Sequence, residues 1–155
     1  MNYKIAFLIG SESDRKTAES SLPYFNYFNL HLDLLVMSAH RNPQEVSDFA
    51  SNARNKGYSL LICGAGMAAH LGGAVKANTT LPVIGVPLPG GMMDGLDSLL
   101  STVQMPKGVP VATMSVGKSG AINAAIFCAE VLSLNNDDLV KKLNEFKNNG
   151  ATISD

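Results

Sequence analysis

The chain has 155 residues, a length typical of one domain that can bury a substantial core unaided. Hydrophobic residues make up 46% of it and charged residues only 16%, against about 25% in average globular proteins, which excludes a disordered chain and predicts that other subunits cover part of its surface. The 12 basic and 13 acidic residues give a net charge of −1, without the basic excess of nucleic-acid-binding proteins. We therefore predict a single domain over residues 1–155 and no nucleic-acid partner.

Short apolar runs that are typical of buried strands alternate along the chain with longer helical stretches. The predicted strands are, in chain order, Lys4–Ile9, His31–Met37, Ser59–Cys63, Pro82–Val86 and Pro110–Val116. The predicted helices are Ser13–Phe28, Pro43–Lys56, Met67–Asn78, Asp94–Thr102 and Ser119–Ser133, followed by an amphipathic helix near the C-terminus, residues 136–150. This alternation indicates βαβ units and a parallel sheet covered on both faces. We predict a three-layer α/β fold with a five-stranded parallel sheet.

Several of these helices begin with capping signals. Asn42 precedes Pro43 and Glu45, and Ser119 and Asn136 stand before the last two helical stretches. Residues 119–129 contain no charge, so a helix there is apolar on all sides and must be covered on all sides. We predict that the sheet covers one side and a second subunit the other, which makes the protein a homo-oligomer; a central helix within one domain is the alternative.

No segment resembles a membrane span or a targeting signal. Residues 58–75 are apolar but are interrupted by glycines and by His70, and no cleavage site follows residues 1–10. Cys63 and Cys128 are far apart and have neither C-x-x-C nor zinc-ligand spacing, which indicates buried thiols in a reducing compartment. We expect a cytoplasmic protein with no membrane contact and no metal.

Ligands of doubly wound sheets bind outside the carboxyl ends of the strands, and the loop after the first strand carries suitable groups for a nucleotide. Ser11 and Ser13 offer hydroxyls beside the free N–H groups of a helix start, where a phosphate binds readily. Asp14 suits the vicinal hydroxyls of a ribose, and Gly10 begins the loop. Plain helix capping is the alternative role for these residues.

The loop after the second strand combines an acid–base group with a cation. Ser38 and Ala39 lead to His40, whose imidazole exchanges protons near neutral pH, and to Arg41, whose guanidinium binds phosphate or carboxylate in a fork. The alternative is a solvated histidine and an ordinary surface arginine.

Small residues dominate the loop after the third strand, residues 64–73. Glycine and alanine let the backbone approach a flat ligand closely, and His70 is placed to hydrogen-bond such a ligand. Tight packing, with His70 as a satisfied polar group, is the alternative. The segment Pro87–Gly91 after the fourth strand is either a mobile flap over the site or an ordinary connection.

Six segments in register from about Ile5 to Leu132 together resemble the N5-carboxyaminoimidazole ribonucleotide mutase family, the bacterial-type enzymes of purine biosynthesis: GSESD, SAHRNP, GAGMAAHLGG, TTLPVIGVP, GLDSLLSTVQMPKGVPVAT and GAINAA. The resemblance implies a flavodoxin-like αβα sandwich and a homo-octamer with active sites at subunit contacts. It also implies an isomerase that moves a carboxylate from N5 to C4 of the imidazole by decarboxylation and recarboxylation, without metal, ATP or organic cofactor.

The same resemblance implies roles for single residues. His40 is the proton-transfer group, Ser11, Ser13 and Arg41 bind the 5′-phosphate, and Asp14 binds the ribose. The loop from Gly64 to Leu71 encloses the imidazole and the migrating carboxyl group. The full set of substrate-binding residues predicted beside the catalytic His40 is Gly10, Ser11, Ser13, Asp14, Ser38, Ala39, Arg41, Gly64, Ala65, Gly66, Ala69, His70 and Leu71.

Some residues depart from the family pattern, and two other functions stay open. Met67 stands where glycine is often found and is bulky enough to narrow the base pocket; Arg15, Asn42 and Gly72 also depart. One alternative function is direct carboxylation of aminoimidazole ribonucleotide with CO2, and the other is a flavodoxin-like nucleotide-binding module. Against a flavin carrier, the chain has no tryptophan and the three loops have no aromatic residue; against a phospho-receiver, residues 64–66 contain no aspartate.

Overall fold

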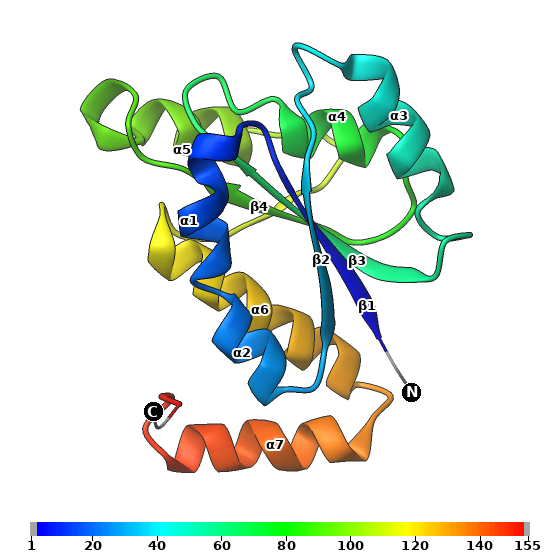
Figure 1. Cartoon of the computed structure of the whole chain (residues 1–155), viewed down its shortest axis with the longest axis vertical. Helices are drawn as coiled ribbons and strands as arrows, with labels where there is room; N and C mark the ends of the chain where they lie inside the picture. The colour runs from blue at the N-terminus through cyan, green and yellow to red at the C-terminus, as the bar shows by residue number, and fades with distance from the viewer. Residues whose placement is uncertain (1–2, 154–155) are drawn as a thin grey trace.

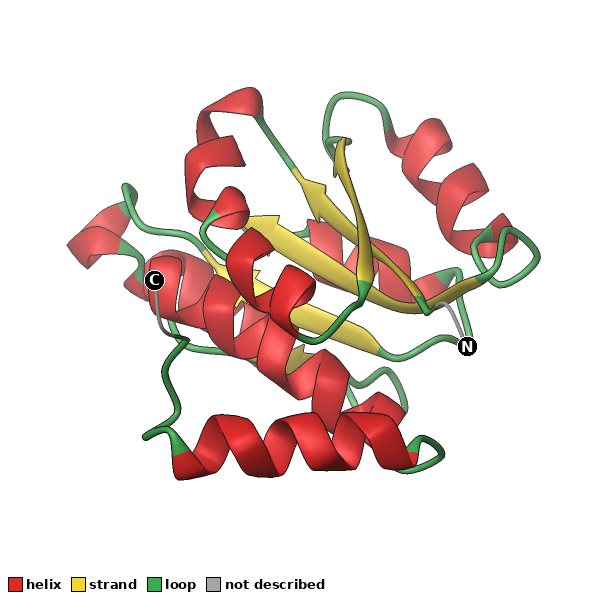
Figure 2. Cartoon of the chain, turned by 60° about the horizontal axis from the view of Figure 1, so that its bottom comes forward, coloured by secondary structure: helices red, strands yellow, loops and turns green. Residues whose placement is uncertain are grey.

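A parallel sheet of five strands in the order β2-β1-β3-β4-β5 forms the middle layer of the protein (Figures 1 and 2). The computed structural model describes residues 3–153, so residues 1–2 and 154–155 of the predicted domain lie outside the described residues. The strands are β1 (Lys4–Ile9), β2 (His31–Val36), β3 (Tyr58–Ala65), β4 (Val83–Pro87) and β5 (Ala112–Thr113). This order is the flavodoxin-like one, with its reversal beside β1, and the predicted fold class is confirmed.

The strands β1, β2 and β3 run in the same direction and end at the same level of the sheet. Ile9 at the end of β1 pairs with Val36 of β2 on one side and with Gly64 of β3 on the other. The residues of β1 from Ile5 to Ile9 are fully buried, as expected of a strand covered on both faces. The loops that follow β1, β2 and β3 therefore begin side by side.

Helices cover both faces of the sheet in two layers. On one face lie α1 (Arg15–Glu19), α2 (Leu22–Tyr27) and α6 (Lys118–Ser133), with α7 (Asp137–Asn148) packed outside α6 and α2 (Figures 1 and 2). On the other face lie α3 (Pro43–Asn52), α4 (Leu71–Ala77) and α5 (Leu96–Val103). The short 3-10 helices η1 (Glu12–Asp14) and η2 (Met92–Asp94) complete the described elements.

The predicted helix over Ser13–Phe28 is wrong in one respect, because the structure breaks it between α1 and α2. Pro23 has no N–H to donate to the Glu19 carbonyl, so the α-helical ladder cannot continue through it. The hydroxyl of Ser21, which is fully buried, instead donates to the Ala18 carbonyl at 2.6 Å and seals the end of the first helix.

The predicted fifth strand, Pro110–Val116, is confirmed only over Ala112–Thr113. These two residues pair with Ile84 and Gly85 of β4. Beyond them the partner strand reaches Pro87, which has no N–H to donate to a neighbouring strand. The ladder therefore stops early at this edge.

One side of α6 packs on the sheet through small residues, and α1, α2 and α7 of the same chain flank it. The buried residues of this side are Gly120, Ala121, Ala124, Ala125, Cys128 and Ala129. The chain itself thus supplies more of the cover of α6 than its uncharged sequence predicts. The helix begins at Lys118 and not at Ser119, with no side-chain cap, whereas the Asn136 cap of α7 is confirmed by its bonds from the N–H groups of Asp138 and Leu139.

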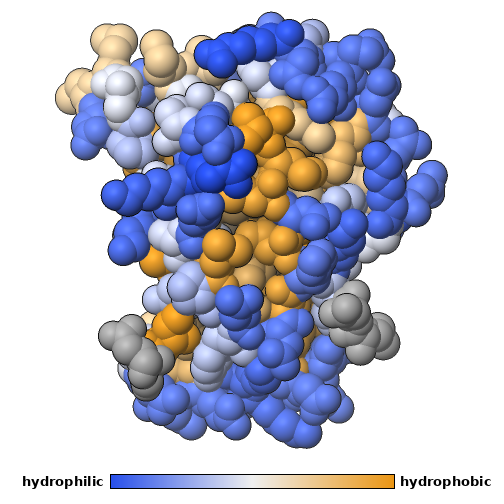
Figure 3. Space-filling model, viewed as in Figure 1, coloured by the Kyte–Doolittle hydropathy of each residue, from blue (hydrophilic) through white to orange (hydrophobic). Residues whose placement is uncertain are grey.

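None of the helices within residues 3–153 is both long and apolar enough to span a bilayer. Cys63 and Cys128 are buried free cysteines, and burial raises the pKa of each thiol far above its usual range. Both therefore behave as small apolar groups, as the sequence predicts. On the face shown in Figure 3, apolar surface gathers over the middle, where the edge strand β2 lies between the two helix layers and Val36 is 40% exposed.

A polar cluster fixes β2 to its neighbours at the end of the sheet where the strands begin. Asp33 of β2 accepts a hydrogen bond from the Tyr58 hydroxyl at 2.5 Å, and it pairs with the Lys4 ammonium and with the His31 ring, each at 3.0 Å. Burial alone would raise the pKa of Asp33, but the hydrogen bonds from Tyr58 and Lys4 outweigh it and hold that pKa below its usual range. The charged form of Asp33 therefore stabilises the fold.

We predict that Asp33→Asn lowers the free energy of unfolding at pH 7. Because the folded-state pKa is depressed, this stabilisation is present above the ordinary carboxyl pKa and is lost as the pH falls through the folded-state value. Urea unfolding at a series of pH values should show the difference between wild type and variant shrinking in acid. Asp48→Asn on α3, an exposed carboxylate beside Gln44, is the control. A difference that grows in acid would contradict this role of Asp33.

Candidate active site

A cleft of about 620 Å³ opens at the carboxyl ends of β1, β2 and β3, where the strand order reverses. All three loops singled out by the sequence line it, and the segment after β4 contributes to it as well. Its lining residues are Gly10, Ser11, Ser13, Asp14, Ser38, Ala39, His40, Arg41, Ala65, Gly66, Met67, Ala68, His70, Leu71, Pro89 and Gly90.

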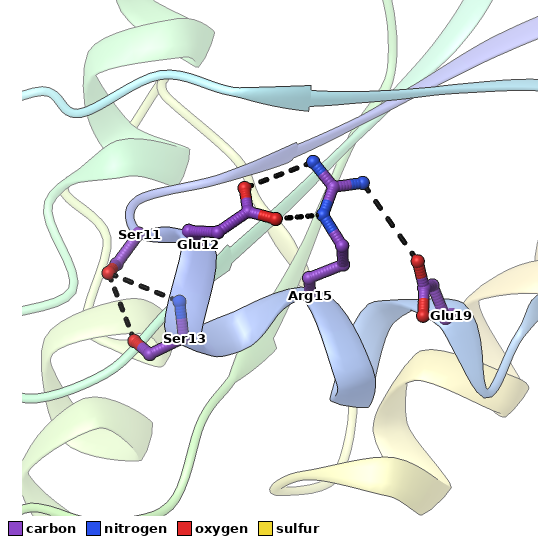
Figure 4. A network of polar contacts seen from close by, with 5 residues as sticks. All are labelled: Ser11, Glu12, Ser13, Arg15 and Glu19. Carbon is purple, nitrogen blue, oxygen red and sulfur yellow. Dashed lines mark hydrogen bonds and ion pairs between the residues drawn. The ribbon is translucent and has the colours of Figure 1, made fainter.

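The loop after β1 presents two hydroxyls at the start of a helical turn. The N–H of Gly10 donates to the Gly64 carbonyl at 3.2 Å, which fixes the start of this loop to the end of β3. The Ser11 side chain caps η1, and the Ser13 hydroxyl donates to the Ser11 hydroxyl at 3.0 Å (Figure 4). The N–H groups of Ser13 and Asp14 donate to Ser11. Two adjacent hydroxyls at the start of a helical turn can donate hydrogen bonds to a phosphate.

The charged neighbours of this loop leave it open to an anion. The Arg15 guanidinium pairs with Glu12 and with Glu19, and it extends away from Ser11 and Ser13 (Figure 4). Burial raises the pKa of Asp14, although contacts with the Ser13 side chain and the Ser11 backbone partly oppose this shift. A carboxylate that has lost part of its hydration accepts hydrogen bonds from sugar hydroxyls readily.

The loop after β2 is a turn closed by its own side chains. The amide oxygen of Asn42 accepts from the Ser38 N–H at 2.8 Å, and the Ser38 hydroxyl accepts from the Arg41 N–H at 3.2 Å. Asn42 therefore shapes the turn, and the prediction that its side chain caps α3 is wrong. Among residues 3–153 no carboxylate forms an ion pair with Arg41, so its charge is available to a ligand in the cleft.

Two histidines from different loops meet in the cleft. The Nε2 atom of His40 lies 2.6 Å from the Nδ1 atom of His70, and the two rings cross at 72°. One proton between these nitrogens satisfies both, so each ring fixes the orientation and tautomer of the other. The pair is placed to give and take a proton at a bound ligand.

The loop after β3 is held by α5, which lies in the same helix layer as the α4 helix that follows the loop. The Ser101 hydroxyl of α5 accepts from the Ala69 N–H at 2.9 Å and lies 3.2 Å from the Met67 carbonyl oxygen. This contact positions the residues that lead directly into His70. On the other side, the Leu88 N–H donates to the Ala65 carbonyl at 2.9 Å, which ties the segment after β4 to the same loop.

The cleft brings together twelve of the fourteen predicted site residues. Gly64 and Ala69 are absent from its lining, because Gly64 is packed under Phe7 and Ala69 is buried against Ser101. The sequence predicted that Met67 is near the base pocket and left the segment of Pro89 and Gly90 as either a flap or an ordinary connection, and all three residues line the cleft. Ser101 was missed, since nothing in its sequence context distinguishes it from other helical serines. Ligand binding by these residues stays a prediction.

Within residues 3–153 no three histidine, cysteine, aspartate or glutamate side chains are grouped so as to hold a metal ion. The chemistry that this chain's own residues offer is proton transfer by imidazole and anion binding by hydroxyls, backbone N–H groups and one guanidinium.

Comparisons with known proteins agree on one family. The family model described as AIR carboxylase matches residues 4–152. The N5-carboxyaminoimidazole ribonucleotide mutase of Bacillus subtilis is 46% identical over 94% of this chain and 90% of its own length. The mutase of the same name from Escherichia coli K12 is 42% identical over 93% of this chain and 85% of its own length.

A solved structure supports the fold. The crystal structure of Treponema denticola PurE superposes with a TM-score of 0.87, covers 97% of this chain and 92% of its own, and is 24% identical. At that identity the likeness concerns the fold alone.

We predict that Ser11→Ala and Arg41→Ala each weaken binding of ribose 5-phosphate by about tenfold, as expected when one hydrogen bond to a charged group is lost. Isothermal titration calorimetry measures this directly. Ser51→Ala is the control, because that exposed hydroxyl lies on α3 and donates to the Ser47 carbonyl. Unchanged affinity in both cleft variants would contradict phosphate binding by Ser11 and Arg41.

Proposed function

The chain belongs to the AIR carboxylase family, and on that premise we propose that its cleft converts N5-carboxyaminoimidazole ribonucleotide to the 4-carboxy isomer. The observation that carries this proposal is the meeting, in one cleft, of two serine hydroxyls and a guanidinium suited to a phosphate with a hydrogen-bonded histidine pair. Relatives that are 46% and 42% identical have the name of this mutase. The protein is accordingly an isomerase of purine biosynthesis.

The phosphorylated end of the substrate is held by the first two loops. Ser11, Ser13 and Arg41 bind the 5′-phosphate, and Asp14 accepts hydrogen bonds from the ribose hydroxyls. The mutually hydrogen-bonded hydroxyl pair, the guanidinium without an ion pair and the partly desolvated carboxylate described above support this assignment. The aminoimidazole then extends toward the third loop, where Ala65 and Gly66 leave room for a flat ring.

The first chemical step protonates the carbamate. His40 in its charged form gives a proton to the N5 nitrogen, the bond between that nitrogen and the carboxyl carbon breaks, and CO2 leaves with the electron pair retained on nitrogen. Aminoimidazole ribonucleotide remains in the cleft. A positioned imidazole is worth roughly 10²–10⁴ in rate for such a transfer.

The second step forms the new carbon–carbon bond. The enamine-like C4 carbon of the ring attacks CO2, and the same His40, now neutral, removes the C4 proton. One proton is consumed at N5 and one is returned from C4, so the histidine ends as it began. His70, 2.6 Å away, holds the ring of His40 in place through both steps.

Both steps move one group between two atoms of a single molecule. We therefore propose that the reaction requires no ATP, metal or organic cofactor. We also propose that the enzyme works in the cytoplasm, where a reducing environment suits its two buried free thiols.

The proposal is tested by an isomerisation assay with synthetic N5-carboxyaminoimidazole ribonucleotide in EDTA without ATP. We expect the 4-carboxy product from this substrate. If only aminoimidazole ribonucleotide with bicarbonate is turned over, the enzyme is instead a direct carboxylase. If neither is turned over but nucleotide binds, the chain is a binding module.

His40→Asn should abolish this turnover while leaving aminoimidazole ribonucleotide bound with an affinity within about threefold of wild type, because asparagine preserves polarity but cannot shuttle a proton. Stopped-flow absorbance and calorimetry give the two quantities. The control is His31→Asn, which alters a histidine in the Asp33 cluster outside the cleft. Substantial turnover by the His40 variant would contradict its role as acid and base.

We propose further that copies of this chain assemble into an oligomer, an octamer if the family resemblance extends to stoichiometry. Charged residues are scarce, and α5 exposes Leu96, Leu100 and Val103, three apolar side chains at helical spacing, by 39–49%. This face adjoins the cleft, since Ser101 of the same helix contacts the third loop. A second copy that covers α5 would lie close to the site.

Light scattering coupled to chromatography should therefore give a mass several times 16.4 kDa. Leu100→Arg should lower that mass, because a desolvated guanidinium opposes burial of the face. Leu134→Arg is the matched control, since Leu134 is 80% exposed at the end of α6. A monomeric wild type would refute the assembly.

A further inference from the structure

The backbone of Met67 adopts a conformation that side-chain-bearing residues rarely take. Its φ is +54°, in the left-handed region that glycine enters freely and other residues enter at a cost of about 1 kcal/mol or more. Five non-glycine residues among those described have a positive φ, and Met67 alone of these lines the cleft. A bulky side chain thus occupies a position where the local backbone geometry favours none.

The surrounding structure fixes this conformation from two sides. Ser101 of α5 contacts the carbonyl oxygen of Met67 and the N–H of Ala69, and Ser101 is itself bonded to the Asp97 carbonyl at 2.8 Å. On the other side, Gly66 lies against the backbone of Leu88 and Pro89. The direction in which the Met67 side chain leaves the loop is therefore determined by the fold.

The Met67 side chain is an exposed apolar group in a cleft whose lining is about equally polar and apolar. It is 67% exposed, and Pro89 and Gly90 of the segment after β4 line the same cleft. A thioether with three rotatable bonds can fold over a flat ring and adapt to its shape. When this exposed side chain moves onto a bound ligand, it buries apolar surface, and that burial favours the closed position.

We propose that Met67 is a substrate-covering residue, which closes over the imidazole and the released CO2 and thereby decides how much of the CO2 reaches C4. This inference rests on the proposed isomerisation. After the bond to N5 breaks, CO2 either forms the bond to C4 or escapes to solvent and leaves aminoimidazole ribonucleotide as the product. An apolar cover slows escape and keeps out water, so the internal transfer prevails.

The partition is measured with substrate labelled with ¹³C in its N5 carboxyl group, in buffer that contains unlabelled bicarbonate. Wild type should retain the label in the 4-carboxy product. Met67→Gly should release roughly three- to tenfold more label per substrate consumed, the effect of losing one partly covered apolar group. Met67→Leu, which restores apolar bulk, should stay close to wild type; an enzyme-free sample corrects for spontaneous loss.

Met93→Gly is the matched control, because Met93 has a φ of +49°, is 81% exposed and lies outside the cleft lining. Both glycine variants relieve the same kind of backbone conformation, but only the Met67 variant should change the partition. Equal label retention in Met67→Gly and wild type overturns the inference. So does a Met67→Gly variant whose label loss is accompanied by a fall in oligomer mass, since Met67 would then act at a subunit contact.

A second measurement does not depend on turnover. The methyl signal of Met67, one of seven methionines, is identified in ¹³C NMR as the signal absent from Met67→Leu. It should shift when aminoimidazole ribonucleotide is added, while the Met93 signal stays in place. If wild type forms no 4-carboxy product, the proposed function fails, whereas an unshifted Met67 signal with bound nucleotide refutes the cover itself.

Discussion

The alignment of three strand ends is the constraint on which the site depends. Ile9, Val36 and Gly64 share one level of the sheet, and the bond from the Gly10 N–H to the Gly64 carbonyl carries that alignment into the loops. Residues 30 positions apart, such as His40 and His70, consequently meet within a hydrogen bond. The strands themselves contribute no chemistry; their burial fixes where the chemistry begins.

Rigid support and local strain are combined around this edge. The turns that hold the reactive groups are closed by the side chains of Ser38, Asn42 and Ser101. Nothing in the sequence around these residues distinguishes them from other serines and asparagines. Pinned loops can keep a residue such as Met67 in an unfavourable backbone region, because the contacts of Ser101 and the packing of Gly66 compensate for it.

Hydrophobic periodicity was sufficient to predict the fold class and the first strand, Lys4–Ile9, residue for residue. Periodicity did not predict the breaks in helices and strands that depend on a single missing N–H group. The missing N–H of Pro23 splits the first helix, and that of Pro87 shortens the pairing of β5. The uncharged stretch 119–129 suggested cover by a neighbour, yet much of that cover comes from α7, the next helix in the chain, and from α1 and α2, which are distant in sequence.

The sequence predicted which loops form the site but not the contacts between their side chains. The loops rich in serine, histidine, arginine and glycine converge as expected, because polar groups after adjacent parallel strands must lie together. The 2.6 Å contact between two histidines, the support from Ser101 and the left-handed backbone of Met67 depend on tertiary geometry that no spacing encodes. A crystal structure with aminoimidazole ribonucleotide tests the central claim most directly: we expect the phosphate at Ser11 and Arg41 and the imidazole beside His40, and a nucleotide bound away from these residues would contradict the account.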